Sequence, residues 1–183
     1  MNFLKKNLFY LVATAILLVV WLVPSVRVKL NTLFFPIATV EEAITLNDAD
    51  YNIQLKGMNV PDANLKDFKG KKLVLLNFWG TWCAPCREEW PTIQKLHDSK
   101  KDKVDFVLIA MQDKEEAVKK FLQENNYTVP VYMAESPVTA NVLPKAFPTT
   151  FLLDKNGRIL LKEDASKDWN TKSVHDMIDA MAK

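Results

Sequence analysis

The body of the chain alternates apolar runs with polar segments in a pattern that predicts several strands. Residues 73–79 and 104–111 are nearly continuous apolar runs, typical of strands buried on both faces of a sheet. Alternating apolar and polar residues predict a short strand at 51–55, followed by a turn. Pro130 bounds the short run 129–133 and has no N–H to donate, so we expect a weak or edge strand there.

Helical spacing of apolar residues predicts three helices in the same region, over residues 84–98, 115–124 and 171–182. Near the end of the chain, the strand-like segments 149–153 and 158–162 flank a polar tetrapeptide that ends in Gly157. Glycine tolerates a positive φ, so this arrangement predicts a hairpin. Together the elements predict an α/β domain with one mixed sheet covered by helices on both faces.

The N-terminal part of the chain differs from the rest, because residues 8–23 are almost wholly apolar. Sixteen helical residues span about 24 Å, whereas the hydrocarbon core of a bilayer is about 30 Å thick. A few flanking residues, with Lys5 and Lys6 reaching the headgroups, bring the helix close to that thickness. We therefore expect a membrane anchor over residues 1–25 and a linker over 26–44.

A cleaved signal peptide is the competing interpretation, since Lys5 and Lys6 also make a basic leader. Small residues around Ser25 would suit cleavage, but the apolar run is long for a leader and no A-x-A pattern follows it. The basic residues on the two sides of the run are nearly balanced, so charge alone does not orient the segment.

Composition and charge exclude several protein classes. The 183 residues are 49% hydrophobic and 25% charged, which fits a globular protein and not a collagen-like or disordered chain. The first 35 residues hold four basic and no acidic residues, so they account for the positive net charge of +2. The remainder is slightly acidic, and we expect no nucleic-acid partner. Two cysteines cannot form the multi-bridge framework of small secreted domains, so they are free to serve chemistry.

Cys83 and Cys86 lie directly after the predicted strand 73–79, at the start of the helix over 84–98. A thiol at a helix N-terminus faces unpaired N–H groups and the positive end of the helix dipole. Both lower its pKa, from about 8.5 into the range of about 3.5–7.5. Pro85 suits the first turn, where its missing N–H costs little. We therefore assign Cys83 as the exposed nucleophile that attacks a substrate disulfide, and Cys86 as the thiol that resolves the mixed disulfide.

A Cys-x-x-Cys pair can also be half of a zinc site. Zinc takes four ligands, and besides the cysteines the chain offers only His97 and His175 as ligands of the usual kind. Their spacing does not suit a metal, so we expect none and assign both histidines to the surface or the core.

Three segments carry a resemblance to a known family. They read NFWGTWCAPCREEWP at residues 77–91, FKGKKLVLLNFWGTWC at 68–83 and PKAFPTTFLLDKNGRIL at 144–160. Over most of residues 45–183 the chain resembles thioredoxin-like proteins, and most closely the TlpA/ResA-type membrane-anchored thiol–disulfide oxidoreductases of the bacterial cell envelope. The resemblance implies a thioredoxin-like domain over 45–183, preceded by the transmembrane helix.

The resemblance also implies roles for residues outside the cysteine pair. Pro148 would follow a cis peptide bond and lie against the cysteines. The backbone groups of Phe147 and Thr149 would there hold an extended substrate strand. Trp82 and Pro85 would belong to the same substrate-binding surface.

Asn77 and Glu89 show which members of the thioredoxin-like family the chain resembles most. Thioredoxins carry a buried Asp in the strand before the cysteines, whereas this chain has Asn77, which cannot shuttle a proton. Glu89, one turn after Cys86, is at the position of an acidic residue that TlpA/ResA-type members use near their cysteines. The hypothesis is that Glu89 raises the pKa of the cysteines by like-charge repulsion and relays protons. The alternative is that Glu88 and Glu89 are only favourable acids near the start of the helix.

The resemblance implies an enzyme on the outer side of the cytoplasmic membrane that reduces disulfides in envelope proteins, for example the haem-binding cysteines of apocytochrome c. It implies no cofactor beyond the redox-active Cys83–Cys86 pair. A dithiol on that side must be re-reduced by a transmembrane electron donor. A thiol oxidase or isomerase is the alternative, because direction depends on redox potential. A non-catalytic thioredoxin-like binding module also stays open.

Overall fold

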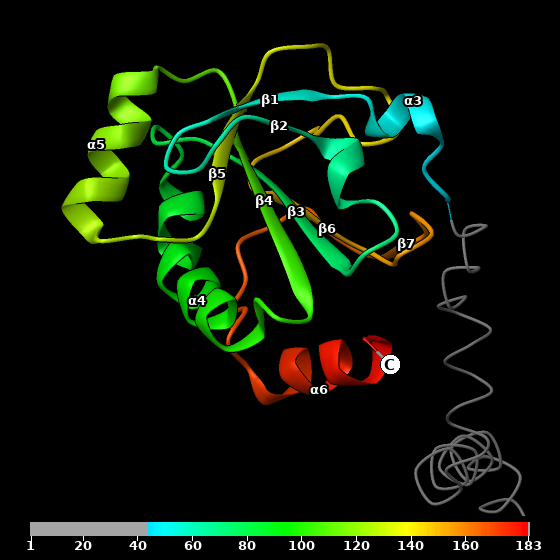
Figure 1. Cartoon of the computed structure of the whole chain (residues 1–183). Coiled ribbons are helices and arrows are strands. Elements are labelled where there is room, and N and C mark those ends of the chain that lie inside the picture. Colours follow the sequence, from blue (N-terminus) through cyan, green and yellow to red (C-terminus); the bar gives the residue numbers. More distant parts are fainter. Residues whose placement is uncertain (1–43, 183) are drawn as a thin grey trace, which may run out of the picture. The chain divides into compact units, whose positions relative to one another are not determined.

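The computed structural model describes residues 44–182, in which a seven-stranded sheet forms the centre (Figure 1). The strand order is β2-β1-β5-β4-β3-β6-β7. Three neighbouring strands run parallel, namely β3 (Leu73–Trp79), β4 (Val104–Ala110) and β5 (Val131–Ala134). The other strands pair antiparallel at the two sides: β1 (Gln54–Gly57), β2 (Ala63–Asn64), β6 (Thr149–Leu153) and β7 (Ile159–Glu163).

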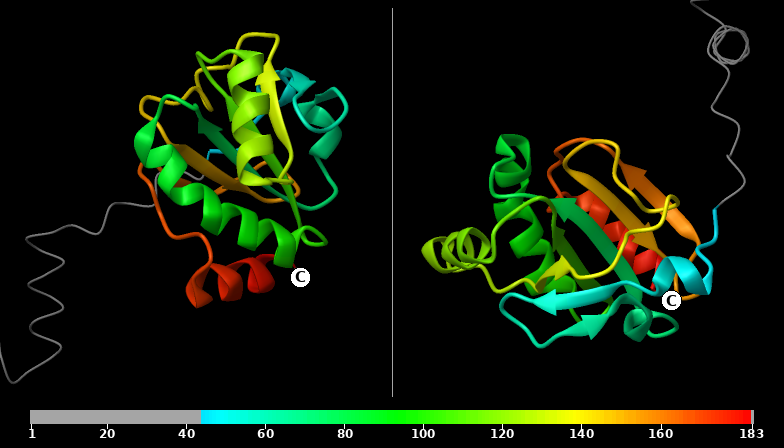
Figure 2. Two further views of the ribbon diagram at one scale, coloured as in Figure 1. Left: turned by 90° about the vertical axis from the view of Figure 1, so that its left-hand side faces the viewer. Right: turned by 90° about the horizontal axis from the view of Figure 1, so that it is seen from above.

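The three helices predicted from apolar spacing all cover the same face of this sheet (Figure 2). They are α4 (Ala84–Lys100), α5 (Glu115–Asn125) and α6 (Lys172–Met181), and their apolar side chains share one core cluster with alternate residues of the strands. The opposite face is covered by the four-residue helix α3 (Asp48–Tyr51), the 3-10 helix η1 (Leu65–Phe68) and the loop 135–148. Helices therefore lie on both faces of the sheet, as expected, but on the second face they are only the short helices α3 and η1.

Two predicted strands differ from the structure. β5 is not an edge strand, because it lies between β4 and β1; Pro130 precedes its first residue, and the Pro130 carbonyl accepts a hydrogen bond from Leu108. The strand expected at 51–55 starts only at Gln54, because Asn47 caps α3 and draws Tyr51 into that helix.

The first described residues are joined to the C-terminal hairpin. The amide of Ile159 donates to the carbonyl of Ile44, and the amide of Leu46 donates to the carbonyl of Gly157, both at 2.9 Å. The predicted anchor and nearly all of the predicted linker lie outside the described residues. Within 44–182, no helix is both long enough and apolar enough to cross a bilayer.

A buried carboxylate fixes the loop 135–148 against α3. Asp50 is only 2% exposed, and its carboxylate accepts hydrogen bonds from the Thr139 hydroxyl at 2.6 Å and the Asn141 amide at 3.0 Å. It also accepts the backbone N–H of Asn47 at 2.9 Å. Burial acts to raise the pKa of Asp50, but these hydrogen bonds outweigh it and lower the pKa below 3.8.

We expect Asp50→Ala to lower the free energy of unfolding by about 2–3 kcal/mol, because the loop loses the charged acceptor that holds Thr139 and Asn141. Urea unfolding of the two proteins measures this difference. The contribution of Asp50 should be complete above about pH 5 and be lost as the pH falls through its lowered pKa. Asp48→Ala is the matched control, since its side chain is 97% exposed. An equal loss in both variants would contradict the role of Asp50.

Candidate redox-active site

The two cysteines lie where β3 ends and α4 begins. A disulfide joins Cys83 and Cys86, with their Cα atoms 5.3 Å apart, as their spacing predicts. Cys86 is fully buried and Cys83 is 5% exposed, so the predicted exposure of Cys83 is wrong for this disulfide form. The reason is that both sulfurs belong to the core cluster between the sheet and the helices. The small remaining accessibility is nevertheless on Cys83.

Cys83 is the N-cap residue of the 17-residue helix α4. Its backbone is extended, and its Sγ accepts the N–H of Cys86 at 3.3 Å. Pro85 lies in the first turn, as predicted. The unpaired N–H groups of this turn and the helix dipole favour negative charge at the same sulfur. A reduced Cys83 in this position is therefore biased towards the thiolate, which is the nucleophilic form.

A second segment faces the motif from the loop before β6. The peptide bond between Phe147 and Pro148 is cis, as the resemblance implies. The rings of Phe147 and Trp82 meet edge to face, with centroids 5.4 Å apart. The Thr149 hydroxyl lies 2.8 Å from the carbonyl oxygen of Ala146. The structure thus brings Trp82, which is 51% exposed, next to the residue before the cis-proline.

The turn after β4 holds the residues just before Cys83, an arrangement that no local sequence pattern predicts. The carboxylate of Asp113 accepts the backbone N–H of Thr81 at 2.6 Å and the Thr81 hydroxyl at 2.9 Å. The Trp82 indole N–H donates to the carbonyl of Met111 at 3.1 Å. A Cβ at Gly80 would lie 2.5 Å from this indole nitrogen, so only glycine allows this close approach.

Glu89 is buried in the layer between α4 and the sheet, with 2% exposure. The Asn77 amide donates to its Oε1 at 3.0 Å, while the Trp169 indole and the backbone N–H of Lys167 donate to its Oε2 at 2.9 and 3.3 Å. Burial raises the pKa of Glu89, and these hydrogen bonds only partly offset the rise. Cys86 and Glu89 are three residues apart on one helix, so their side chains share a face.

This burial distinguishes Glu89 from its neighbour. Glu88 is exposed, as expected for an ordinary acid near a helix start, whereas Glu89 is not a surface residue. Asn77 also donates to the Thr150 hydroxyl at 2.8 Å, so its amide nitrogen serves two acceptors. Its oxygen has no partner among residues 44–182. The amide is therefore oriented as a donor to the Glu89 carboxylate.

His97 takes part in packing, whereas His175 makes a polar contact. His97 stacks edge to face on Phe106, with centroids 5.1 Å apart, and burial lowers its pKa. His175 lies on α6 with its Nε2 3.0 Å from the Asn170 side chain. Among the described residues, no group of three or more His, Cys, Asp or Glu side chains could hold a metal ion.

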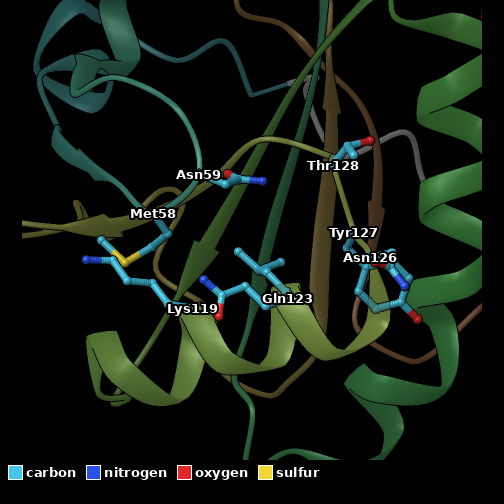
Figure 3. A pocket seen from close by; sticks show the side chains of 8 residues that line it. Met58, Asn59, Lys119, Gln123, Asn126, Tyr127 and Thr128 are labelled. Carbon is cyan, nitrogen blue, oxygen red and sulfur yellow. The ribbon is translucent and has the colours of Figure 1, made fainter.

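A hollow of about 500 Å³ lies between α5 and the turn after β1 (Figure 3). It contains none of the residues of the predicted site. The Asn59 side chain at its rim is bonded to the backbone of Val129 and Val131, and Lys119 pairs with Glu115. These polar groups hold the fold together, and we assign no ligand to this hollow.

Comparison with known proteins identifies the family. The model of the family described as Redoxin matches residues 47–178, which is most of the chain and nearly all of its described part. The chain belongs to the Redoxin family.

Named relatives show which kind of Redoxin-family protein the chain is similar to. ResA of Bacillus thuringiensis subsp. konkukian, named a thiol-disulfide oxidoreductase, is 34% identical over 75% of this chain and 81% of its own. ResA of Geobacillus kaustophilus is 32% identical over 85% of this chain and 87% of its own. The thioredoxin-like protein YneN of Bacillus subtilis is 36% identical, but the match covers 59% of this chain and only 65% of YneN.

Solved structures of thiol:disulfide interchange proteins have a fold similar to that of this chain. A putative thiol:disulfide interchange protein DsbE from Chlorobium tepidum has a TM-score of 0.62 at 26% identity, covering 73% of this chain and 96% of that one. A thiol:disulfide interchange protein from a Bacteroides species has a TM-score of 0.59 at 27% identity, covering 69% and 86%. This Redoxin-family chain therefore has a thioredoxin-like fold and is an oxidoreductase of the ResA type, as the sequence motifs indicate.

Proposed function

We propose that this protein reduces disulfides in other proteins through a Cys83–Cys86 dithiol. The observation that carries the proposal is the position of Cys83 as the N-cap of α4, with the Cys86 N–H directed at its sulfur. That arrangement stabilises a thiolate at the more accessible of the two sulfurs. The related ResA proteins, which share the fold and are named thiol-disulfide oxidoreductases, support it.

The reaction consists of two thiol–disulfide exchanges. The Cys83 thiolate attacks one sulfur of the substrate disulfide, a new S–S bond forms, and the other substrate sulfur leaves as a thiolate that takes a proton. Cys86 then loses its proton and attacks the Cys83 sulfur, which releases the second substrate thiol. Two electrons have moved to the substrate, and the Cys83–Cys86 disulfide remains. Glu89, buried and on the same helix face as Cys86, accepts the proton of Cys86 in this step.

The surface around Cys83 binds the substrate chain in this proposal. Trp82 supplies an exposed apolar ring next to the sulfur, and Phe147 holds that ring from the side of the cis-proline. Backbone groups of Phe147 and Thr149, on either side of Pro148, pair with an extended segment of the substrate. Pro85 occupies the first turn of α4 on the same side.

The setting of the reaction is part of the proposal. The apolar run 8–23 anchors the chain as a single-pass protein, with the catalytic domain on the extracytoplasmic side of the membrane. Disulfides in envelope proteins, including apocytochrome c during cytochrome c maturation, are the substrates. A dithiol membrane protein that carries electrons across the bilayer reduces the oxidised pair again.

A single-turnover assay tests the function. The full chain, reduced and freed of reductant, is mixed with a peptide disulfide, and both products are followed by mass spectrometry. We expect one Cys83–Cys86 disulfide to form for each peptide disulfide reduced. A chain that stays reduced while the peptide stays oxidised would contradict the proposal. The equilibrium constant of the same exchange against glutathione then separates a reductant from an oxidase or isomerase.

A further inference from the structure

An apolar pocket of about 300 Å³ opens at the carboxyl ends of β4 and β5. Most of its lining is apolar: Met111, Met133, Ala134, Pro137, Val138 and Leu143. This volume is at the lower limit for small-molecule sites, so the pocket is better suited to bind a single side chain than a cofactor. The loop that forms one wall is fixed in place by the hydrogen bonds of Thr139 and Asn141 to the buried Asp50.

The pocket lies at the same edge of the sheet as the cysteines. β3, β4 and β5 are parallel, so their carboxyl ends meet there, and Trp79, Ala110 and Met133 are register partners across the three strands. Neighbouring strands are about 4.8 Å apart, which places β5 about 10 Å from the strand that leads to Cys83. An extended peptide advances about 3.3 Å per residue and covers this separation in about three residues.

The residue beside Cys83 is joined to the wall of the pocket. The Trp82 indole N–H donates to the carbonyl of Met111, and Met111 lines the pocket. Among the described residues, four large apolar side chains are exposed, and they include Trp82 at 51% and Leu143, in the pocket lining, at 50%. The loop with Leu143 continues directly to Phe147 and the cis-proline.

We propose that this pocket binds an apolar side chain of the substrate polypeptide, two to four residues from its reactive cysteine. This inference rests on the proposed function. The carboxylate of Asp113, which also lines the pocket, is already bonded to the N–H and hydroxyl of Thr81 and to the N–H of Lys114. It has little capacity left for a substrate group. Ser136, also in the lining, accepts the N–H of Gln54. Apart from Gln112 the rest of the lining is apolar, so recognition in the pocket is mainly apolar, and it selects substrates by sequence near the disulfide.

Homodimeric peptide disulfides test this inference, because their two sulfurs are equivalent and attack on either gives the same result. Each peptide carries a single Leu or a single Gln, placed one, two, three, four or five residues from the cysteine. All its other positions are Gly or Ser. The full chain, held in lipid nanodiscs, reduces each peptide, and kcat/KM is compared with that for glutathione disulfide. We expect Leu to be favoured about tenfold over Gln at one position two to four residues away, and not elsewhere.

The variant Leu143→Gln should bring this preference to within about twofold, whereas Met181→Gln, which changes an exposed apolar residue on α6, should leave it at tenfold. Leu143 is half exposed, so the substitution should not disturb the fold, and the thermal midpoint checks this. Equal rates for all peptides with the wild-type chain would overturn the proposed role of the pocket but not the proposed function. A Leu preference that persists at tenfold in Leu143→Gln would do the same. Failure to reduce any disulfide, glutathione disulfide included, would instead refute the proposed function.

Discussion

The Cys86→Ser variant should accumulate a mixed disulfide between Cys83 and its substrate, whereas Cys83→Ser should form none. Cys83 holds the accessible sulfur at the helix N-cap, and Cys86 is fully buried behind it. Without Cys86, the first exchange still occurs but no internal thiol releases the substrate. Without Cys83, the remaining thiol has no access to a substrate sulfur. Both variants should lose at least about a thousandfold in turnover, because the two thiols act as one unit.

The measurement is non-reducing electrophoresis followed by mass spectrometry of the adduct, first with a peptide disulfide and then with envelope proteins. The double variant Cys83→Ser/Cys86→Ser gives the background. The Cys83→Ser variant would contradict the assignment of the nucleophile if it formed adducts on Cys86 as fast as the Cys86→Ser variant forms them on Cys83. With envelope proteins, the trapped species also identifies the substrate, which tests the proposed role in cytochrome c maturation.

Glu89→Gln should slow the resolving step by about a hundredfold, since a positioned proton acceptor contributes on that order. Burial raises the pKa of Glu89, so the wild-type rate should fall as the pH drops through that raised pKa, where the carboxylate becomes protonated. This acidic limb should be absent in the variant. Loss of the like charge should also move the thiol titration to lower pH. Stopped-flow single turnovers at several pH values measure the rate.

Glu88→Gln is the matched control, because the neighbouring glutamate is exposed and on the same helix turn. It should leave both the rate and the pH profile unchanged. Glutamine keeps most of the packing and the acceptor oxygen for the Trp169 indole, so a purely structural Glu89 would change stability without removing the acidic limb. A thiol titration that is the same in wild type and Glu89→Gln would remove Glu89 from the mechanism.

The parts of the fold that could be predicted are those with long, regular patterns. β3 and β4 are seven-residue runs buried almost throughout, and α4 follows a clear helical period, so the sequence predicts them almost to the residue. α3 and η1 have four residues each, too few for a periodic signal. They cover one face of the sheet, which is why the distribution of helices over the two faces was not foreseen.

The site could be predicted where its residues are close in sequence. Cys83, Cys86 and Glu89 share one helix start, and their spacing alone puts them together. The partners that complete the site come from distant segments: Trp169 is 80 residues from Glu89, and Asp113 is 32 residues from Thr81. No local pattern marks such pairs, because the first arises only when α4 packs against the segment before α6, and the second only when β3 and β4 align their carboxyl ends. The burial of Cys83 in the disulfide form has the same origin in tertiary packing.

The start of α4 should lower the pKa of Cys83 and so bias this sulfur towards the thiolate. The most direct test is the pH dependence of alkylation of Cys83 by iodoacetamide in the reduced Cys86→Ser chain, because the midpoint of that profile does not depend on how accessible the sulfur is. We predict a midpoint clearly below 8.5, the pKa of a free cysteine. A midpoint at or above that value would contradict the account.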